Sequence, residues 1–291
     1  MSKVKKIRIT TPATSANLGP GFDFLGIALT KYNVFEFEES DHDQEIGFKG
    51  VGNNVVKSCF KKLVRKYGNR DIKVKITMVK NGIPVARGLG SSASAIVTGC
   101  VAANYFLGNI IDENTLIDEM VKFEGHPDNV LPCYKGGLIS TLSNTTYYYK
   151  HKVNKDLVFN VLIPNYKVRT EDARKALPKE YSLSDVTFNA SRAMLLPKAL
   201  EDGDINLIKK VTDDKIHEPY RKPLIKEWNK VEESVKDYDA KLNISGSGPT
   251  MLMISKEANN NEIINLIRSL NLRLEMHSLK VSDVGCELFE L

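Results

Sequence analysis

Cysteine is scarce in this sequence, and its placement does not suit a metal site. The chain of 291 residues holds four cysteines, which are scattered without the spacing of metal ligands. They are Cys59, Cys100, Cys133 and Cys286. The first three lie among apolar neighbours, as buried free thiols do. We therefore expect a reducing, cytoplasmic location.

Long apolar runs and a dominant charge are also missing. The N-terminal segment lacks the apolar run of a signal peptide, and no segment reaches the length of a membrane span. The net charge of +5 is spread along the chain. Its densest basic cluster, residues 3–8, is short and interleaved with apolar residues, which favours a solvated first strand. We expect neither a membrane nor a nucleic acid as partner.

The composition itself is that of an ordinary globular protein, with 42% apolar and 26% charged residues. The length allows one large or two ordinary domains. Strands and helices follow one another irregularly in both halves, which predicts an α+β fold and not a regular βαβ array. A polar stretch at residues 150–156 separates two strand-rich halves, so we expect domains at residues 1–153 and 154–291.

The clearest elements surround loops rich in glycine and small polar residues. Apolar alternation predicts strands over residues 7–11, 71–79 and 274–279. Residues 54–67 have the spacing of a helix with one apolar face. Residues 12–23 are dense in glycine, proline and small polar groups, and they predict a loop.

The most informative stretch is a glycine-rich loop that opens an apolar, alanine-rich segment. Its residues are Pro84, Val85, Ala86, Arg87, Gly88, Leu89, Gly90, Ser91, Ser92, Ala93, Ser94 and Ala95. Glycine permits positive φ and lets a ligand approach the backbone closely. The first N–H groups of a helix have no intrahelical partner, and the helix dipole favours an anion beside them. The stretch therefore predicts a phosphate-binding loop.

Three other interpretations of this stretch compete. It could be a plain loop-to-helix junction capped by serine, because Gly-Ser junctions are common. Its G-x-G-x-x-A pattern also matches a relaxed dinucleotide motif, but the acidic residue near the required distance, Asp112, lies at a helix start and not at a strand end. A Walker loop needs Gly-Lys-Ser/Thr, and no lysine lies between Lys80 and Lys122, so that interpretation fails.

Glycine-containing loops stand out at residues 12–23, 84–95 and 245–250. Three such loops at the start, middle and end of one chain resemble the signature of the GHMP small-molecule kinases, and the resemblance covers nearly the whole length. Residues 12–23 (PATSANLGPGFD) and 124–130 (EGHPDNV) look like the homoserine kinase branch of that superfamily.

The resemblance implies transfer of the γ-phosphoryl group of ATP, with Mg²⁺, to the side-chain hydroxyl of L-homoserine, a step of threonine biosynthesis. It implies an N-terminal domain like the second domain of ribosomal protein S5 and a ferredoxin-like C-terminal domain. ATP and substrate would meet between the two domains. Members of the family often form homodimers, so a second copy of the chain is the protein partner it suggests.

The resemblance also assigns residues to the nucleotide end. Backbone N–H groups of residues 88–93 would hold the phosphates. Ser92 and Glu124 would hold Mg²⁺, which prefers hard oxygen ligands, and both would be catalytic. The alternatives are a helix cap for Ser92 and a solvated carboxylate for Glu124. Asn53 and Asn54 are candidates for the adenosine side, with a helix N-cap as the competing role.

L-Homoserine is a zwitterion with a hydroxyl tail, so its site needs an acid, cations and polar groups. Asn17 and Asp23 match the family positions that hold the amine and hydroxyl end. His126 matches the histidine beside the substrate, with a core histidine as the alternative. Arg174 and Arg221 would hold the carboxylate, because the guanidinium fork binds it bidentately. For either arginine, the alternative is a surface role.

The catalytic base is not apparent. Other GHMP kinases place an aspartate where this chain has Asn129, as in the homoserine kinase branch, and an amide cannot act as a base. Asp128 is adjacent, but its direction cannot be derived from the sequence. A loose phosphoryl-transfer transition state needs little nucleophilic push, so we expect catalysis by positioning and charge neutralisation, with Asn129 near the hydroxyl. Gly246 would close the site from the C-terminal half.

Two other functions fit the same fold. One is a GHMP kinase for a different alcohol, such as mevalonate or shikimate. The other is a non-catalytic sensor of ATP or an amino acid. The two arginines and Asp23 favour a zwitterion over a plain carboxylic acid. The presence of Ser92, Glu124 and all three glycine loops argues against a site that has lost catalysis.

Overall fold

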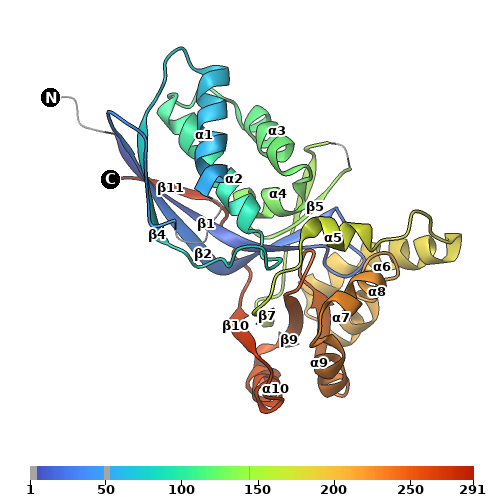
Figure 1. Ribbon diagram of the computed structural model, residues 1–291. Helices are drawn as coiled ribbons and strands as arrows, with labels where there is room; N and C mark the ends of the chain where they lie inside the picture. Colours follow the sequence, from blue (N-terminus) through green and yellow to red (C-terminus); the bar gives the residue numbers. More distant parts are fainter. Residues whose placement is uncertain (1–4, 49–52, 144) are drawn as a thin grey trace.

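The computed structural model describes residues 5–48, 53–143 and 145–291, apart from the side chains of residues 53 and 54. The chain forms two β-sheets, and helices pack on both (Figure 1). The larger sheet is built mainly from the N-terminal half and the smaller sheet from the C-terminal half. Within these described ranges, no helix is both long enough and apolar enough to cross a membrane.

The larger sheet has seven strands, in the path β11-β1-β2-β4-β3, with β5 pairing both β2 and β6. The strands are β1 (Lys6–Ala16), β2 (Leu25–Glu39), β3 (Gln44–Ile46), β4 (Val74–Lys80), β5 (Leu138–Thr141), β6 (Tyr148–His151) and β11 (Glu287–Glu290). β3 runs parallel to β4, and the other pairs are antiparallel. β1 and β2 pair from Lys6 opposite Glu38 to Ala16 opposite Gly26, which fixes the turn between them.

β1 is longer than the strand expected over residues 7–11. Residues 12–16, which were expected to form a loop, continue the strand and are buried. The register shifts between Pro12 and Ala13, so a bulge accommodates the proline, which lacks an N–H for the ladder. The turn that reaches the functional site is therefore short and comprises only residues 17–24.

Four helices cover one face of this sheet: α1 (Asn53–Tyr67), α2 (Ser91–Phe106), α3 (Glu113–Glu124) and α4 (Pro127–Lys135) (Figure 1). α2 is the central helix, because its small, apolar residues let it pack against α1, α3, α4 and β1 together. Its side chains share one core with Ile9 of β1 and Phe37 of β2. α4 is not predicted from the sequence; it begins with Pro127 at the first helical position, where the missing N–H is not needed.

The smaller sheet has the order β10-β7-β9-β8, all antiparallel. Its strands are β7 (Leu157–Pro164), β8 (Ala240–Ile244), β9 (Met251–Lys256) and β10 (Leu274–Leu279). The helices of this half are α5 (Thr170–Lys175), α6 (Leu183–Asp202), α7 (Ile205–Val211), α8 (Glu218–Arg221), α9 (Trp228–Val235) and α10 (Glu257–Ser269), with a 3₁₀ turn η1 (Lys222–Leu224). Every residue of β7 is buried, because α6 and α7 pack on one face of the sheet and α9 and α10 on the other.

The last strand returns to the first half of the molecule. β11 pairs antiparallel with β1, with Ile9 opposite Leu288. The sequence predicts a final strand at residues 274–279 but not β11, whose four residues show no period-2 burial. The division at residues 153 and 154 stays a prediction, although the chain crosses between the two sheets a second time at its end.

Candidate functional site

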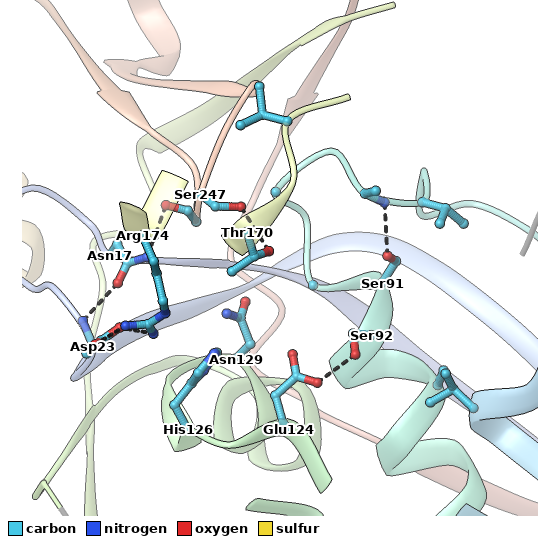
Figure 2. Close-up of a pocket in the computed structure, with 18 of the residues that line it drawn as sticks. Asn17, Asp23, Ser91, Ser92, Glu124, His126, Asn129, Thr170, Arg174 and Ser247 are labelled. Carbon is cyan, nitrogen blue, oxygen red and sulfur yellow. Dashed lines mark hydrogen bonds and ion pairs between the residues drawn. The ribbon is translucent and has the colours of Figure 1, made fainter. Parts of the chain in front are cut away.

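A cavity of about 300 Å³ lies where the two halves meet (Figure 2). Segments from five regions surround it: the β1–β2 turn, the start of α1, the start of α2 with the loop before it, the junction of α3 and α4, and the C-terminal half. Its lining consists of Asn17, Asp23, Val55, Val85, Ala86, Gly88, Gly90, Ser91, Ser92, Ala95, Glu124, His126, Asn129, Val168, Thr170, Arg174, Arg221, Gly246 and Ser247.

The three glycine-containing loops of the sequence are bonded to one another beside this cavity. The backbone N–H of Thr14 donates to the carbonyl of Leu89 (3.2 Å), which ties the first loop region to the second. The Ser245 hydroxyl donates to the carbonyl of Gly88 (2.6 Å), and its oxygen lies 2.9 Å from the Ser15 hydroxyl, from which it can accept. The third loop is thereby fixed against the other two, so the cavity has a rigid backbone wall.

The N-terminus of α2 faces the cavity, which Gly90, Ser91 and Ser92 line. Gly88 and Gly90 have φ of 81° and 67°, and a Cβ on Gly90 would lie 1.9 Å from the Thr14 hydroxyl oxygen. Glycine is therefore required at this position for both conformation and space. The first backbone bond of the helix runs from Ser94 to Gly90, and no side chain of the described residues caps the helix. The preceding N–H groups and the helix dipole favour an anion here.

The side chains of Ser92 and Glu124 contact each other at the first turn of α2, as Figure 2 shows. The Ser92 hydroxyl donates to Glu124 Oε2 (2.6 Å). Burial raises the pKa of the Glu124 carboxyl, although the bond from Ser92 opposes this rise. The Ser91 hydroxyl points elsewhere and accepts from the N–H of Ala86 (3.4 Å). Of the two serines, Ser92 is the one whose oxygen is next to a carboxylate.

Asn17 and Asp23 form the opposite end of the cavity (Figure 2). Both have positive φ, 59° and 62°, which is uncommon for residues other than glycine. The Asn17 side chain accepts from the N–H of Asp23 (2.8 Å) and donates to the carbonyl of Gly246 (3.0 Å). Arg174 holds the Asp23 carboxylate through two bonds of 2.8 and 2.9 Å, and this contact raises the pKa of Arg174.

Arg221 is a buried cation at the same end. Only 2% of the residue is exposed, and its guanidinium donates to the carbonyls of Ala173 (3.3 Å) and Gly246 (3.2 Å). Within the described part of the chain, no carboxylate forms an ion pair with it. Burial, helped by the charge of Arg174, lowers the pKa of Arg221 to about 10. A buried guanidinium bonded only to carbonyls favours binding of an anionic group.

His126 and Asn129 lie between the two ends. His126 Nδ1 bonds to the Asp128 carboxylate (2.7 Å), and this bond raises the pKa of His126. The Asp128 side chain is 1% exposed and does not line the cavity. The Thr14 hydroxyl donates to the side-chain oxygen of Asn129 (2.7 Å). The side-chain nitrogen of Asn129 is 3.4 Å from the Asp128 carboxylate.

Some residues of the glycine-rich loop do not line the cavity: Pro84, Arg87, Leu89, Ala93 and Ser94. Leu89 is buried in the apolar core, and the Ser94 hydroxyl bonds to Thr11 on β1. The role of these residues toward phosphate stays a prediction. Asn53 and Asn54 are the first residues of α1, but their side chains fall outside the described residues.

Several lining residues are not predicted from the sequence, among them Thr170 and Ser247. Their hydroxyls are 3.3 Å apart and join the start of α5 to the β8–β9 loop. Val55 and Val168 add apolar surface. Thr170 stands in the same short segment as Arg174, so the segment was identified but this residue was not. The valines had no sequence signal, since an isolated valine is typical of any core.

Both halves of the chain are similar to known proteins. Residues 54–137 match the family GHMP kinases N terminal domain, and residues 196–270 match GHMP kinases C terminal. The homoserine kinase of Clostridium botulinum (strain Kyoto / Type A2) is 37% identical over 295 residues, which cover 96% of this chain and 97% of that protein. The homoserine kinase of Clostridium acetobutylicum is 40% identical over 270 residues, which cover 89% of this chain and 91% of that protein.

Solved structures give the same result. The crystal structure of homoserine kinase from Cytophaga hutchinsonii is similar with a TM-score of 0.86 and 28% identity, covering 98% of this chain and 97% of that one. Mevalonate diphosphate decarboxylase from Staphylococcus aureus, at TM-score 0.73 and 14% identity, shares the fold, covering 99% of each chain. The expected fold class and resemblance are confirmed: the chain belongs to the GHMP kinases, in their homoserine kinase branch.

Proposed function

We propose that the cavity binds ATP and L-homoserine side by side and transfers the γ-phosphoryl group to the side-chain hydroxyl. One observation carries this proposal. A single cavity joins an uncapped helix N-terminus, suited to phosphates, to the buried Arg221, suited to a carboxylate. Between these two ends the cavity is lined by His126 and Asn129, whose side chains can bind a hydroxyl. Kinase activity with ATP follows from membership of the family.

Ser92 and Glu124 are the residues that would hold Mg²⁺. Their oxygens are 2.6 Å apart, and a hydroxyl with a carboxylate is the hard oxygen donor set that this ion prefers. Among the described residues, no three His, Cys, Asp or Glu side chains form a metal-binding group. The donor set therefore suits an ion shared with phosphate oxygens and not one held by a protein cage. When bound, Mg²⁺ would neutralise charge that develops on the phosphates.

The amino-acid end would hold the zwitterion. Asp23 offers a carboxylate for the ammonium group, and Asn17 lies beside it. Arg174 and Arg221 offer guanidinium groups for the substrate carboxylate. Gly246 contributes its carbonyl, which already accepts bonds from Asn17 and Arg221 and so keeps both side chains in place.

Asn129 would bind the hydroxyl without removing its proton. The neighbouring Asp128 is buried and bonded to His126, and it does not line the cavity. No strong base is then needed if the transition state is loose and the substrates are held in line. The Ser92 and Glu124 pair would supply the charge neutralisation.

The test is ADP release with a panel of acceptors: L-homoserine, L-serine, L-threonine, mevalonate and shikimate, each with and without Mg²⁺. We expect Mg²⁺-dependent ADP release that is fastest with L-homoserine. Faster release with mevalonate or shikimate would assign a different alcohol. ATP binding without acceptor-dependent release would mean a sensor and not a kinase. Light scattering on the same sample would test whether the chain forms a homodimer.

A further inference from the structure

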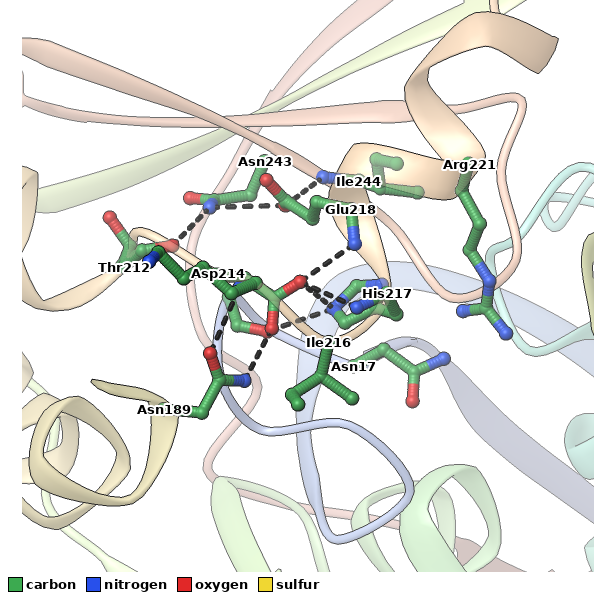
Figure 3. Close-up of polar contacts among 12 residues, drawn as sticks. Asn17, Asn189, Thr212, Asp214, Ile216, His217, Glu218, Arg221, Asn243 and Ile244 are labelled. Carbon is green, nitrogen blue, oxygen red and sulfur yellow. Dashed lines mark hydrogen bonds and ion pairs between the residues drawn. The ribbon is translucent and has the colours of Figure 1, made fainter. Parts of the chain in front are cut away.

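A buried polar cluster lies beside Asn17 and Arg221, the residues of the amino-acid end (Figure 3). It comprises Asp214, His217 and Glu218, with Asn189 and Asn243 at its edges. The side chains of the first three are between 0 and 3% exposed. None of these five lines the cavity, so the cluster does not contact substrate directly.

Asp214 fixes the start of α8. Its Oδ2 accepts from the backbone N–H groups of His217 and Glu218, both at 2.7 Å. The Asn189 amide donates to its other oxygen. This is how a carboxylate stabilises a helix N-terminus, and α8 is a single turn whose last residue is Arg221. The position of the buried guanidinium therefore depends on Asp214.

His217 holds the turn between β1 and β2. The residue is 0% exposed, and its Nε2 lies 2.8 Å from the carbonyl of Gly19. A carbonyl only accepts, so the proton of the ring is on Nε2. Burial lowers the pKa of His217 to about 4, which keeps the ring neutral at neutral pH. The ring also stacks on Phe22, with centroids 5.3 Å apart, and Phe22 in turn lies against Arg174 and Arg221.

The turn needs this support because both of its functional residues are strained. Asn17 and Asp23 have left-handed backbone conformations, which persist only where the surroundings determine them. Gly19, at the middle of the turn, packs so closely on the neighbouring segment that a Cβ would lie 2.7 Å from the Thr212 carbonyl oxygen. The bond from His217 is therefore made at the point where the turn rests on the C-terminal half.

We infer that His217, oriented by Asp214, is a positioning residue of the amino-acid site. It bonds to Gly19 and stacks on Phe22, and it thereby holds Asn17 and Asp23 at one side of the substrate and Arg221 at the other. The inference rests on the proposed role of Asn17 and Asp23. It adds His217 and Asp214 to the site. Neither residue lines the cavity, so both act through the residues that they position.

The test compares His217→Phe with His217→Gln. Phenylalanine keeps a buried ring against Phe22 but removes the donor to Gly19, whereas glutamine keeps an N–H donor. We expect His217→Phe to raise KM for L-homoserine about tenfold, because a buried carbonyl loses its partner, while KM for ATP and kcat change less than about threefold. His217→Gln recovers at least part of the loss.

Asn160→Ala is the matched control. Asn160 is buried in the smaller sheet and donates to Asn260 (2.7 Å) and Ser255 (3.2 Å), away from the cavity. It should lower Tm without changing either KM. If His217→Phe lowers Tm and leaves KM for L-homoserine unchanged, as the control does, the residue is merely structural and the inference is overturned. Should His217→Phe not fold, Asp214→Asn carries the same test with the same expected KM.

Asn17→Ala, measured in parallel, separates this inference from the proposed site. A rise in KM for L-homoserine in Asn17→Ala but not in His217→Phe refutes only the positioning role. No rise in Asn17→Ala refutes the assignment of the turn, and the positioning role with it. A rise in both, with KM for ATP preserved, supports both.

Discussion

Replacing Glu218 by glutamine should change how stability depends on pH. The residue is 2% exposed, and its carboxylate accepts from the N–H of Ile244 (2.8 Å) and the amide of Asn243 (3.3 Å), with Lys222 at 3.6 Å. Burial raises its pKa from 4.5 to about 7. Glutamine has nearly the same shape and keeps an acceptor for Ile244, but it cannot ionise.

The sign follows from the protons bound in each state. Between pH 4.5 and about 7, the unfolded chain has lost the proton of Glu218 while the folded protein keeps it, so the free energy of unfolding falls as pH rises. A pKa of about 7 in place of 4.5 corresponds to about 3 kcal/mol. Below pH 4.5 both states are protonated and the effect vanishes. Glu218→Gln should therefore gain up to about 3 kcal/mol over the native sequence between pH 4.5 and pH 7.

Urea unfolding of both proteins from pH 4.5 to pH 8 measures this difference. His217 produces the opposite slope, because its lowered pKa makes stability fall as pH drops from 6.5 toward about 4. His217 is present in both proteins, so its contribution cancels in the difference between their free energies of unfolding. Glu232→Gln is the control, since Glu232 contacts the same Lys222 (3.2 Å) but is 47% exposed. Parallel curves for Glu218→Gln and the native sequence would refute the reasoning.

Three predictions concern catalysis. Ser92→Ala and Glu124→Gln should each lower kcat by roughly 100-fold or more, whereas Ser91→Ala should not; equal effects of the two serines in ADP release would contradict the assignment. Asp128→Asn should lower kcat less than about tenfold, and loss of transfer with both substrates still bound would show that a base is required. Arg221→Met should raise KM for L-homoserine roughly 10- to 100-fold with Tm retained, and an unchanged KM would exclude carboxylate binding.

The sequence identified the loops of the site better than the side chains within them. Glycines that need positive φ and serines before an apolar segment predicted the α2 N-terminus, because these signals are local. The direction in which a side chain points, however, depends on how its helix packs and not on the local sequence alone. Ser92 and Ser94 are two residues apart, hence about 200° around the helix, and only one reaches the cavity. The sequence alone does not show which face of α2 packs on β1.

The missed elements depended on tertiary contacts. Residues 12–16 have the composition of a loop but form a strand, because β2 pairs with them along their whole length. β11 has four residues, and the strand with which it pairs in the described part of the chain is β1, at the other end of the sequence. His217 and Asp214 have no motif of their own. Their role depends on a turn almost 200 residues away, which only the fold brings into contact.

The contact between Asp23 and Arg174 explains why a zwitterion should be preferred. The two side chains neutralise each other in this structure, and a zwitterion can replace that contact by offering ammonium to Asp23 and carboxylate to Arg174 and Arg221. A carboxylic acid that lacks the ammonium group would bind Arg174 through its carboxylate and leave the Asp23 carboxylate without a partner. 4-Hydroxybutyrate, which is homoserine without its amine, should therefore have kcat/KM roughly 10- to 100-fold lower than L-homoserine. Asparagine tolerates the positive φ of Asp23, so Asp23→Asn should reduce the difference in kcat/KM between the two substrates. An unchanged ratio of the two kcat/KM values would rule out Asp23 as the ammonium site.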